Sequence, residues 1–314
     1  MRVLVTGGFG NLGSWLVKRF LVERWNVTVL ARRYCPTFAA AGAVDYLECD
    51  VADAEQCEAA LRGRAFDAAI HLACASQSTR PSYYREALLV NTLGTRNILE
   101  HLDRATLRQV IFFSTAQVYG VGEGVITEET PPAPHNDYSA THWYAEHYVR
   151  EYERTRAVPC VVLRLSNSYG CPKDATTSQW SLVLNDLARM ACLKGEIRLQ
   201  SNGLAWRDFI WMGDVSEAVV RILRREPRLS GLFNLSSGSS VQLRDLAERV
   251  RAAYRLEFGV DVPVRLNEAD PARPKEPLVV SSERLKAAID FQLHDRVEEE
   301  ARAIFRLVKP GAAG

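Results

Sequence analysis

Apolar runs alternate with amphipathic segments along the first 170 residues of the chain. Each apolar run predicts a buried strand, and the amphipathic segments predict helices that cover a sheet. A continuous run such as 110–113 is typical of a parallel strand that is covered on both faces. The alternation predicts an α/β fold with a doubly wound parallel sheet and a ligand at the carboxyl ends of the strands. The predicted strands are 2–6, 26–30, 44–48, 67–73, 110–113 and 158–165, and the predicted helices include 54–61, 88–102 and 138–153.

The regular pattern weakens after Gly170 and returns at 207–236. At 314 residues the chain exceeds the usual size of a single core, so one large domain with a smaller lobe is expected. We predict that 1–170 form a dinucleotide-binding domain to which 207–236 return. The other segments, 171–206 and 237–314, are predicted to form a smaller C-terminal substrate-binding lobe.

Three spaced glycines follow the first strand without a linker, in Thr6-Gly7-Gly8-Phe9-Gly10-Asn11-Leu12-Gly13. In such a stretch Gly7 allows the tight turn, Gly10 lets backbone N–H groups approach a pyrophosphate, and Gly13 lets helix and sheet pack closely. The N-terminus of the next helix adds unpaired donors and the positive end of the helix dipole. The stretch therefore predicts a Rossmann-type phosphate cradle for a dinucleotide.

The end of the second strand indicates which dinucleotide is bound. NAD-binding folds usually place an acid there for the ribose hydroxyls, whereas NADP-binding folds place an arginine for the 2′-phosphate. This chain has Arg32 and Arg33 there and no acid. Because guanidinium groups match phosphate geometry, NAD(P) binding is predicted, with NADP slightly favoured over NAD. The alternative interpretation is a pair of solvated surface arginines.

The composition limits the classes of partner and location. With a net charge of +1, the protein has no overall electrostatic field that would attract nucleic acid or an anionic membrane. An anionic ligand must therefore be bound by local arginines. No apolar run approaches the ~18 residues of a membrane span, and a strand that starts at Arg2 leaves no room for a signal peptide, so a cytoplasmic protein is expected. The seven scattered cysteines predict neither a disulfide framework nor a metal site.

Taken in order, the motifs of the chain resemble those of the extended short-chain dehydrogenase/reductase family, in particular its nucleotide-sugar epimerases, dehydratases and reductases. The resemblance covers nearly the whole chain. It rests on the glycine-rich stretch, Asp50-Val51, His71-Leu72-Ala73, Asn91 with Gly94-Thr95, 114–120, Tyr138, Asn167 with Tyr169-Gly170, and 207–210.

The resemblance implies a role for each matching residue. Tyr138 would be the acid/base that exchanges a proton with a sugar hydroxyl while hydride passes to or from the nicotinamide, and Thr115 would hydrogen-bond the same oxygen. The implied cofactor-binding residues are Gly7, Gly10, Asn11, Leu12, Gly13, Arg32, Asp50, Val51, Leu72, Ala73, Asn91, Tyr138 and His142. The substrate would be a nucleotide-diphosphate sugar held by Thr115, Asn167, Arg207 and Arg273, the two arginines gripping the diphosphate.

The chain departs from the family pattern one helical turn after Tyr138. The family has a lysine there, which lowers the pKa of the tyrosine and holds the nicotinamide ribose, whereas this chain has His142. An imidazole has an unperturbed pKa of about 6.5 and is mostly neutral at pH 7. Three outcomes follow: His142 is protonated and replaces the lysine, it donates a neutral N–H to the ribose while catalysis runs more slowly, or turnover is lost and binding remains.

The reaction is narrowed by two further positions. Dehydratases of the family carry an Asp-Glu pair directly after the Ser/Thr, where this chain has Ala116 and Gln117, so dehydration is not expected. The predicted function is an NAD(P)-dependent nucleotide-sugar epimerase or 4-ketoreductase that transfers hydride at a sugar carbinol. The expected carbon is C4. The alternative is a catalytically impaired dinucleotide-binding sensor or scaffold of the same fold.

Helices 88–102 and 138–153 resemble the pair through which family members form dimers by a four-helix bundle. We therefore predict a homodimer. The leucines 88, 89, 93 and 99 are expected on buried faces, which the chain's own sheet could equally cover.

Overall fold

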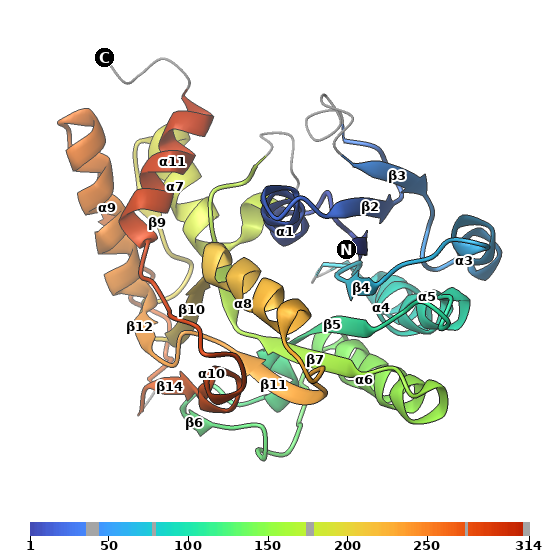
Figure 1. Cartoon of the computed structure of the whole chain (residues 1–314). Helices are drawn as coiled ribbons and strands as arrows, with labels where there is room; N and C mark the ends of the chain where they lie inside the picture. Colours follow the sequence, from blue (N-terminus) through green and yellow to red (C-terminus); the bar gives the residue numbers. More distant parts are fainter. Residues whose placement is uncertain (36–43, 77–79, 174–178, 274–275, 310–314) are drawn as a thin grey trace.

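The computed structural model describes residues 1–35, 44–76, 80–173, 179–273 and 276–309. Its centre is a sheet of seven strands whose neighbours all run parallel, which confirms the predicted doubly wound α/β fold (Figure 1). The strands, in order across the sheet, are β11 (Gly231–Leu235), β7 (Cys160–Leu165), β5 (Gln109–Thr115), β4 (Ala68–His71), β1 (Arg2–Thr6), β2 (Asn26–Ala31) and β3 (Asp45–Glu48).

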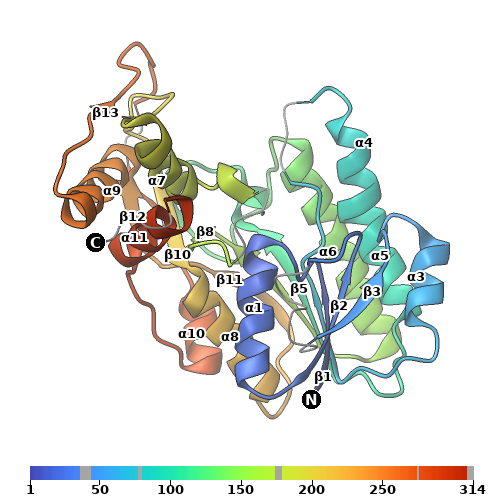
Figure 2. The ribbon, with the colours of Figure 1, turned by 90° about the horizontal axis from the view of Figure 1, so that it is seen from above.

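Helices cover both faces of this sheet, because side chains on both faces of each strand are apolar. On β1, Val3 and Val5 belong to one buried cluster, whereas Leu4 belongs to another on the opposite face. Figure 2 shows the two helical layers. One layer has α1 (Asn11–Val22), α8 (Met212–Arg224) and α10 (Glu283–Ile289), and the other has α3 (Ala54–Leu61), α4 (Tyr83–Ala87), the π-helical turn η1 (Leu88–Leu93), α5 (Gly94–His101) and α6 (Asp137–Arg156).

A separate apolar cluster lies beside the sheet, at the left in Figure 1. It is built by α7 (Val183–Lys194), α9 (Leu243–Phe258) and α11 (Val297–Val308). Three small sheets accompany the central one. The first has three strands in the order β12 (Ser240–Gln242), β10 (Trp206–Trp211) and β8 (Asn167–Tyr169), the second pairs β13 (Val264–Arg265) with β9 (Ile197–Arg198), and the third pairs β14 (Leu278–Val280) with β6 (Gly124–Ile126). Two 3₁₀ helices, η2 (Ala116–Tyr119) and η3 (Gln179–Ser181), complete the described elements.

The packing adds one detail to the predicted division into domains, which stays a prediction. Residues 237–314 are predicted to belong to the lobe, yet α10 packs on the sheet side, where Leu285, Ile289 and Phe291 join the cluster of α1 and α8. A segment distant in sequence therefore completes the core beneath the first helical layer.

The predicted burial of the leucines on helix 88–102 is wrong for three of the four. Leu88, Leu89 and Leu93 are 49%, 47% and 42% exposed, whereas Leu99 is buried against the sheet. The π-helical turn divides the predicted helix before Gly94, and Leu88, Leu89 and Leu93 lie on its exposed side, whereas Asn91 and Thr92 are buried.

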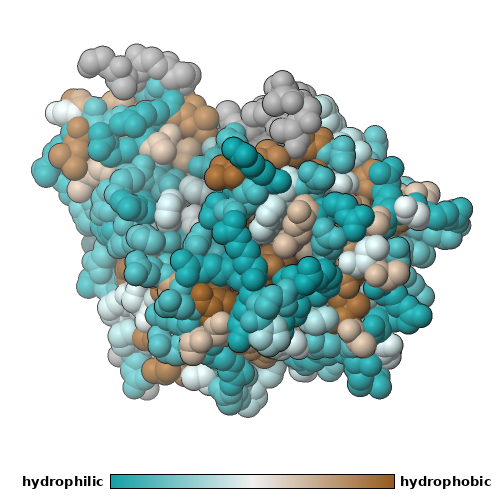
Figure 3. Space-filling model, viewed as in Figure 1, coloured by the Kyte–Doolittle hydropathy of each residue, from teal (hydrophilic) through white to brown (hydrophobic). Residues whose placement is uncertain are grey.

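Hydrophilic side chains predominate on the face shown in Figure 3, where apolar residues are scattered. This surface agrees with a mean hydropathy of −0.14. Within the described residues, none of the helices combines the length and the apolar character that a membrane span requires.

Candidate active site

A cavity of about 1280 Å³ lies where the carboxyl ends of the parallel strands meet the start of α7 and the strands β10 and β14. Parallel sheets bind ligands at this edge, because the loops that follow the strands converge there. Fifteen of the predicted site residues line the cavity: Gly7, Gly10, Asn11, Leu12, Gly13, Arg32, Asp50, Val51, Leu72, Ala73, Thr115, Tyr138, His142, Asn167 and Arg207.

The glycine-rich turn between β1 and α1 leaves no room for side chains. Gly7 has a φ of +69°, and a Cβ there would lie 2.9 Å from the backbone nitrogen of Ala73. A Cβ at Gly13 would overlap the carbonyl oxygen of Gly7. Glycine is therefore required at both positions, at the first by backbone conformation and at both by close approach of the chain. The turn holds the N-terminus of α1 open toward the cavity.

Asn11, the first residue of α1, carries unused hydrogen-bonding capacity at this point. Its side chain is buried, yet neither its oxygen nor its nitrogen has a partner in the described structure. The first turn of α1 has no acidic residue to repel an anion. Because buried polar atoms are nearly always paired, these orphaned atoms, the helix N-terminus and the glycine cradle fit the pyrophosphate of a dinucleotide.

Tyr138 and Thr115 reach the cavity from different elements. The side chain of Asn136 caps α6 by accepting a hydrogen bond from Ser139 N at 2.9 Å, which places Tyr138 in the first turn. Thr115 ends β5, and its hydroxyl accepts a hydrogen bond from Gln117 N at 3.2 Å. The Tyr138 hydroxyl bonds no described residue, so both hydroxyls remain free to donate to a ligand. Burial raises the pKa of Tyr138, with smaller contributions from Cys74 and Tyr83.

His142 lies one turn after Tyr138, with the two ring centroids 4.3 Å apart. Its Nδ1 is 2.8 Å from the backbone carbonyl oxygen of Tyr138. A carbonyl oxygen only accepts, so Nδ1 carries the hydrogen of this bond. The side chain is 3% exposed, and burial lowers its pKa to about 4. The family's lysine is therefore replaced by an imidazole that is neutral at pH 7.

A buried ion pair lies behind these residues and escaped the sequence analysis. Glu146 on α6 is 0% exposed, and its two carboxylate oxygens accept hydrogen bonds from Arg164 Nε and Nη2 at 2.9 and 2.8 Å. It also accepts from Ser114 Oγ at 2.7 Å and from Arg150 Nη2 at 2.8 Å. The pair joins α6 to β7 and, through Ser114, to β5, one residue before Thr115. An arginine within the apolar run of β7 was the signal that could have revealed it.

Arg207 lines the far side of the cavity as a half-buried, unpaired cation. Burial lowers its pKa, and in the described part of the chain no carboxylate forms an ion pair with its guanidinium. The group donates only to the carbonyl of Trp206, at 2.8 Å. Asn167 lies on the neighbouring strand, where its Nδ2 donates to the Asp208 carbonyl at 2.9 Å. A guanidinium without a counter-ion in a cavity is suited to a ligand phosphate.

Two predicted site residues lie away from the cavity. Asn91 was predicted to bind the cofactor, but its buried amide is occupied, accepting from Ala75 N at 2.7 Å and donating to Thr141 Oγ1 at 3.0 Å. It therefore ties the segment after β4 to α6. Arg273 was predicted to bind the substrate, but it is exposed and donates to the carbonyls of Asp270 and Ala272. Neither residue lines the cavity.

The cavity also contains residues that the sequence analysis missed. They come from loops and from the lobe, where no periodic pattern marks them: Cys74, His135, Asn136, Ser166, Ser168 and 181–184. Ala116 and Gln117 line it as well, directly after Thr115.

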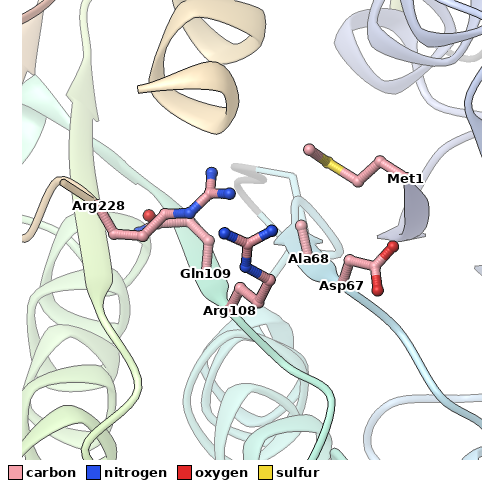
Figure 4. A pocket seen from close by; sticks show the side chains of 6 residues that line it. All are labelled: Met1, Asp67, Ala68, Arg108, Gln109 and Arg228. Carbon is pink, nitrogen blue, oxygen red and sulfur yellow. The ribbon is translucent and has the colours of Figure 1, made fainter. Parts of the chain in front are cut away.

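A second, smaller cavity of about 340 Å³ opens at the opposite, amino-terminal edge of the sheet (Figure 4). The guanidinium groups of Arg108 and Arg228 point toward one another there, but both pair with Glu226, at 2.8 and 2.9 Å. Its lining is completed by Met1, Asp67, Ala68 and Gln109. It contains neither a glycine cradle nor an unpaired cation, so the large cavity is the candidate active site.

Comparison with known proteins agrees with this geometry. Residues 3–235 match a sequence model of the family described as "NAD dependent epimerase/dehydratase family". UDP-glucose 4-epimerase from Streptomyces lividans is 31% identical over 80% of this chain and 80% of that protein. UDP-arabinose 4-epimerase 1 from Arabidopsis thaliana is 27% identical over 88% of this chain and 74% of that protein.

The same likeness extends to solved structures. The crystal structure of UDP-glucose 4-epimerase from Thermus thermophilus in complex with NAD has a TM-score of 0.79 and 27% identity, and the match covers 99% of this chain and 100% of that one. The glycine cradle, the placement of Tyr138 and Thr115 and these matches lead to one conclusion: the chain is an enzyme of the NAD-dependent epimerase/dehydratase family.

Proposed function

We propose that this chain is an NAD(P)-dependent nucleotide-sugar 4-epimerase. The observation that carries the proposal is one cavity that holds a dinucleotide cradle, two free hydroxyls, Tyr138 and Thr115, and the unpaired cation Arg207. Relatives named as UDP-sugar 4-epimerases support epimerisation over the 4-ketoreductase reaction, and they do not favour a sensor or scaffold. In this proposal the helices α7, α9 and α11 form the substrate-binding lobe.

The chemistry assigns each residue a task. A bound dinucleotide would accept hydride from the sugar C4 and return it to the opposite face. The Tyr138 oxygen takes the proton of the C4 hydroxyl and later returns it to the ketone oxygen, as a general base and then a general acid. Thr115 donates to that same oxygen and orients it. Ala116 and Gln117 have no group that exchanges protons near neutral pH, so no elimination of water follows.

The dinucleotide is proposed to lie along the glycine cradle and to reach Asp50, Val51, Leu72 and Ala73. Arg32, exposed at the end of β2, would favour NADP slightly over NAD. One feature opposes that preference: β3 pairs Glu48 with Ala31, so an acid lies on the neighbouring strand. Chromatography of the dinucleotide that is released from the purified protein by denaturation decides between NAD and NADP.

The test of the function is conversion of UDP-sugars, followed by ¹H NMR of the anomeric protons. UDP-glucose, UDP-arabinose and UDP-glucuronate form the panel, with a bound dinucleotide as the only redox reagent. The proposal expects the C4 epimer to form without net change in the dinucleotide. Net consumption of reduced dinucleotide with a 4-keto sugar would indicate a ketoreductase, and absence of both reactions would refute the proposal.

Substitution of Arg207 by methionine is expected to weaken nucleotide binding. A charged hydrogen bond to phosphate contributes about 1.5 to 3 kcal/mol, so KM should rise about 10- to 100-fold with little change in kcat. Calorimetry with UDP should show the same loss of affinity without any turnover. Arg198→Met is the matched control, because Arg198 is exposed and pairs with Glu196 on the lobe. Equal UDP affinities of the two variants would contradict the assignment of Arg207.

We further propose a homodimer formed through α4, η1 and α6. The exposed apolar side chains on these elements are Tyr84, Leu88, Leu89, Leu93 and Tyr144. The double variant Leu89→Glu, Leu93→Glu should be a monomer, whereas the wild-type protein should have twice the chain mass of 35.2 kDa. Light scattering measures both masses. Leu256→Glu is the control, since Leu256 is 75% exposed on α9. A wild-type protein with the monomer mass would refute the dimer.

A further inference from the structure

The imidazole of His142 has one nitrogen bound and one nitrogen free. Nδ1 donates to the Tyr138 carbonyl at 2.8 Å, as an i to i−4 bond within α6. The ring lies between the aromatic rings of Tyr138 and Phe112, with centroids 4.3 and 6.3 Å away. No described residue donates to or accepts from Nε2, although the side chain lines the cavity. The orientation of the free nitrogen is thus fixed by the helix and by the two rings.

Burial opposes a second proton on His142, and the charge of Glu146 favours one only to a smaller extent. The carboxylate that acts on His142 is Glu146, one turn further along α6, and its oxygens already accept from Arg164, Arg150 and Ser114. Two guanidinium charges thus offset this single anion. From β4, His71 lies beyond the ring of Phe112 and is neutral near pH 7, because burial lowers its pKa to about 3.

The two titratable groups that act on Tyr138, Cys74 and Tyr83, also carry no charge at neutral pH. Burial raises the pKa of Cys74 to about 11 and that of Tyr83 to about 12. The pKa of the Tyr138 phenol is raised as well, and no cation of the described chain contributes to lowering it. A neutral imidazole with hydrogen on Nδ1 has a lone pair on Nε2.

We infer that His142 faces the cavity as a hydrogen-bond acceptor and accepts from a hydroxyl of the dinucleotide ribose instead of supplying positive charge. This polarity is opposite to that of a lysine, which can only donate. It also excludes the predicted alternative in which the neutral ring donates an N–H, because that hydrogen is engaged with the Tyr138 carbonyl. The inference rests on the proposed dinucleotide site. It implies that Tyr138 works without a neighbouring cation from the described part of the chain.

The tautomer can be measured without substrate. Long-range ¹H–¹⁵N spectra of histidine-labelled protein contain six imidazoles, and comparison with His142→Gln identifies the signals of His142. We expect a protonated Nδ1 and an unprotonated Nε2, with no change between pH 8 and pH 5.5. Imidazolium shifts at pH 7, or hydrogen on Nε2 of the neutral ring, would overturn the inference.

Dinucleotide affinity supplies the second test, by calorimetry on protein stripped of its cofactor. Replacement of His142 by phenylalanine removes the acceptor and keeps an aromatic ring, so affinity should fall about three- to tenfold, the value of one hydrogen bond. His142→Gln retains an acceptor oxygen and should restore most of the affinity. Equal affinities of the phenylalanine variant and wild type would contradict the assigned acceptor; if that variant does not fold, the spectra decide alone.

The pH profile of turnover tests the consequence for Tyr138. The phenolate is the base, so the logarithm of kcat/KM should rise with pH without a plateau at neutral pH. His142→Lys places an ammonium one turn from the phenol, which should move the rise at least one pH unit lower. Coincident profiles would refute the inference. If no sugar is converted by either protein, the proposed function fails, whereas the spectra and affinities still decide the state of His142.

Discussion

Replacement of Tyr138 by phenylalanine should lower kcat/KM for the proposed nucleotide-sugar substrate by about two to four orders of magnitude, the usual contribution of a general acid/base. Among the described residues of the cavity, the phenol is the group proposed to take the proton of a sugar hydroxyl, because Thr115 ionises far above neutral pH and the free nitrogen of His142 is assigned to the dinucleotide ribose. The loss should appear in kcat, since the ring and its packing remain. Single-turnover measurements with bound dinucleotide separate this step from product release.

The control for this prediction is that the Tyr138→Phe variant still binds its ligands. The phenol oxygen bonds no described residue, so its removal leaves the hydrogen bonds of the fold intact. Affinities for the dinucleotide and for UDP should therefore stay within about threefold of wild type. Val121→Ala offers a matched change at an exposed lining residue of the same cavity. Tyr138→Phe activity above about one tenth of wild type would contradict the assignment.

Replacement of Glu146 by leucine should lower the free energy of unfolding by about 3 to 5 kcal/mol. The substitution leaves Arg164, which is 1% exposed, without the carboxylate that accepts from its Nε and Nη2. The ring of Tyr119, 4.7 Å from the guanidinium, cannot replace that charge. Urea denaturation followed by fluorescence measures the effect as a shift of the midpoint at constant m.

Two further variants make this prediction specific. Glu146→Leu combined with Arg164→Met removes both charges and should recover most of the lost stability, because a buried pair replaced by apolar residues is often neutral in free energy. Glu151→Leu changes an exposed glutamate on the same helix and should stay within about 0.5 kcal/mol of wild type. A Glu146→Leu variant as stable as Glu151→Leu would show that Arg164 finds water or another partner.

The local patterns that predicted the fold depend on neighbours in the sequence. Alternating apolar and amphipathic segments predicted each of the strands from β1 to β7 that enter the central sheet, and the glycine spacing predicted the turn before α1. Backbone periodicity and glycine conformation act over a few residues, so they are readable without a structure. The same local pattern failed for Leu88, Leu89 and Leu93, because helical periodicity does not reveal a π-helical turn.

The sequence by itself determined the parallel α/β fold, the glycine-rich turn before α1 and the cavity positions of Tyr138 and Thr115. Only the tertiary structure decided which polar atoms are free: Asn11 is unpaired in the cavity, while Asn91 accepts from Ala75 and donates to Thr141. The tertiary structure also decided that Arg207 has no counter-ion among the described residues and that Glu146 pairs with Arg164. The physical reason is that a polar side chain is available to a ligand only if no other segment bonds it, and those partners lie far away along the chain.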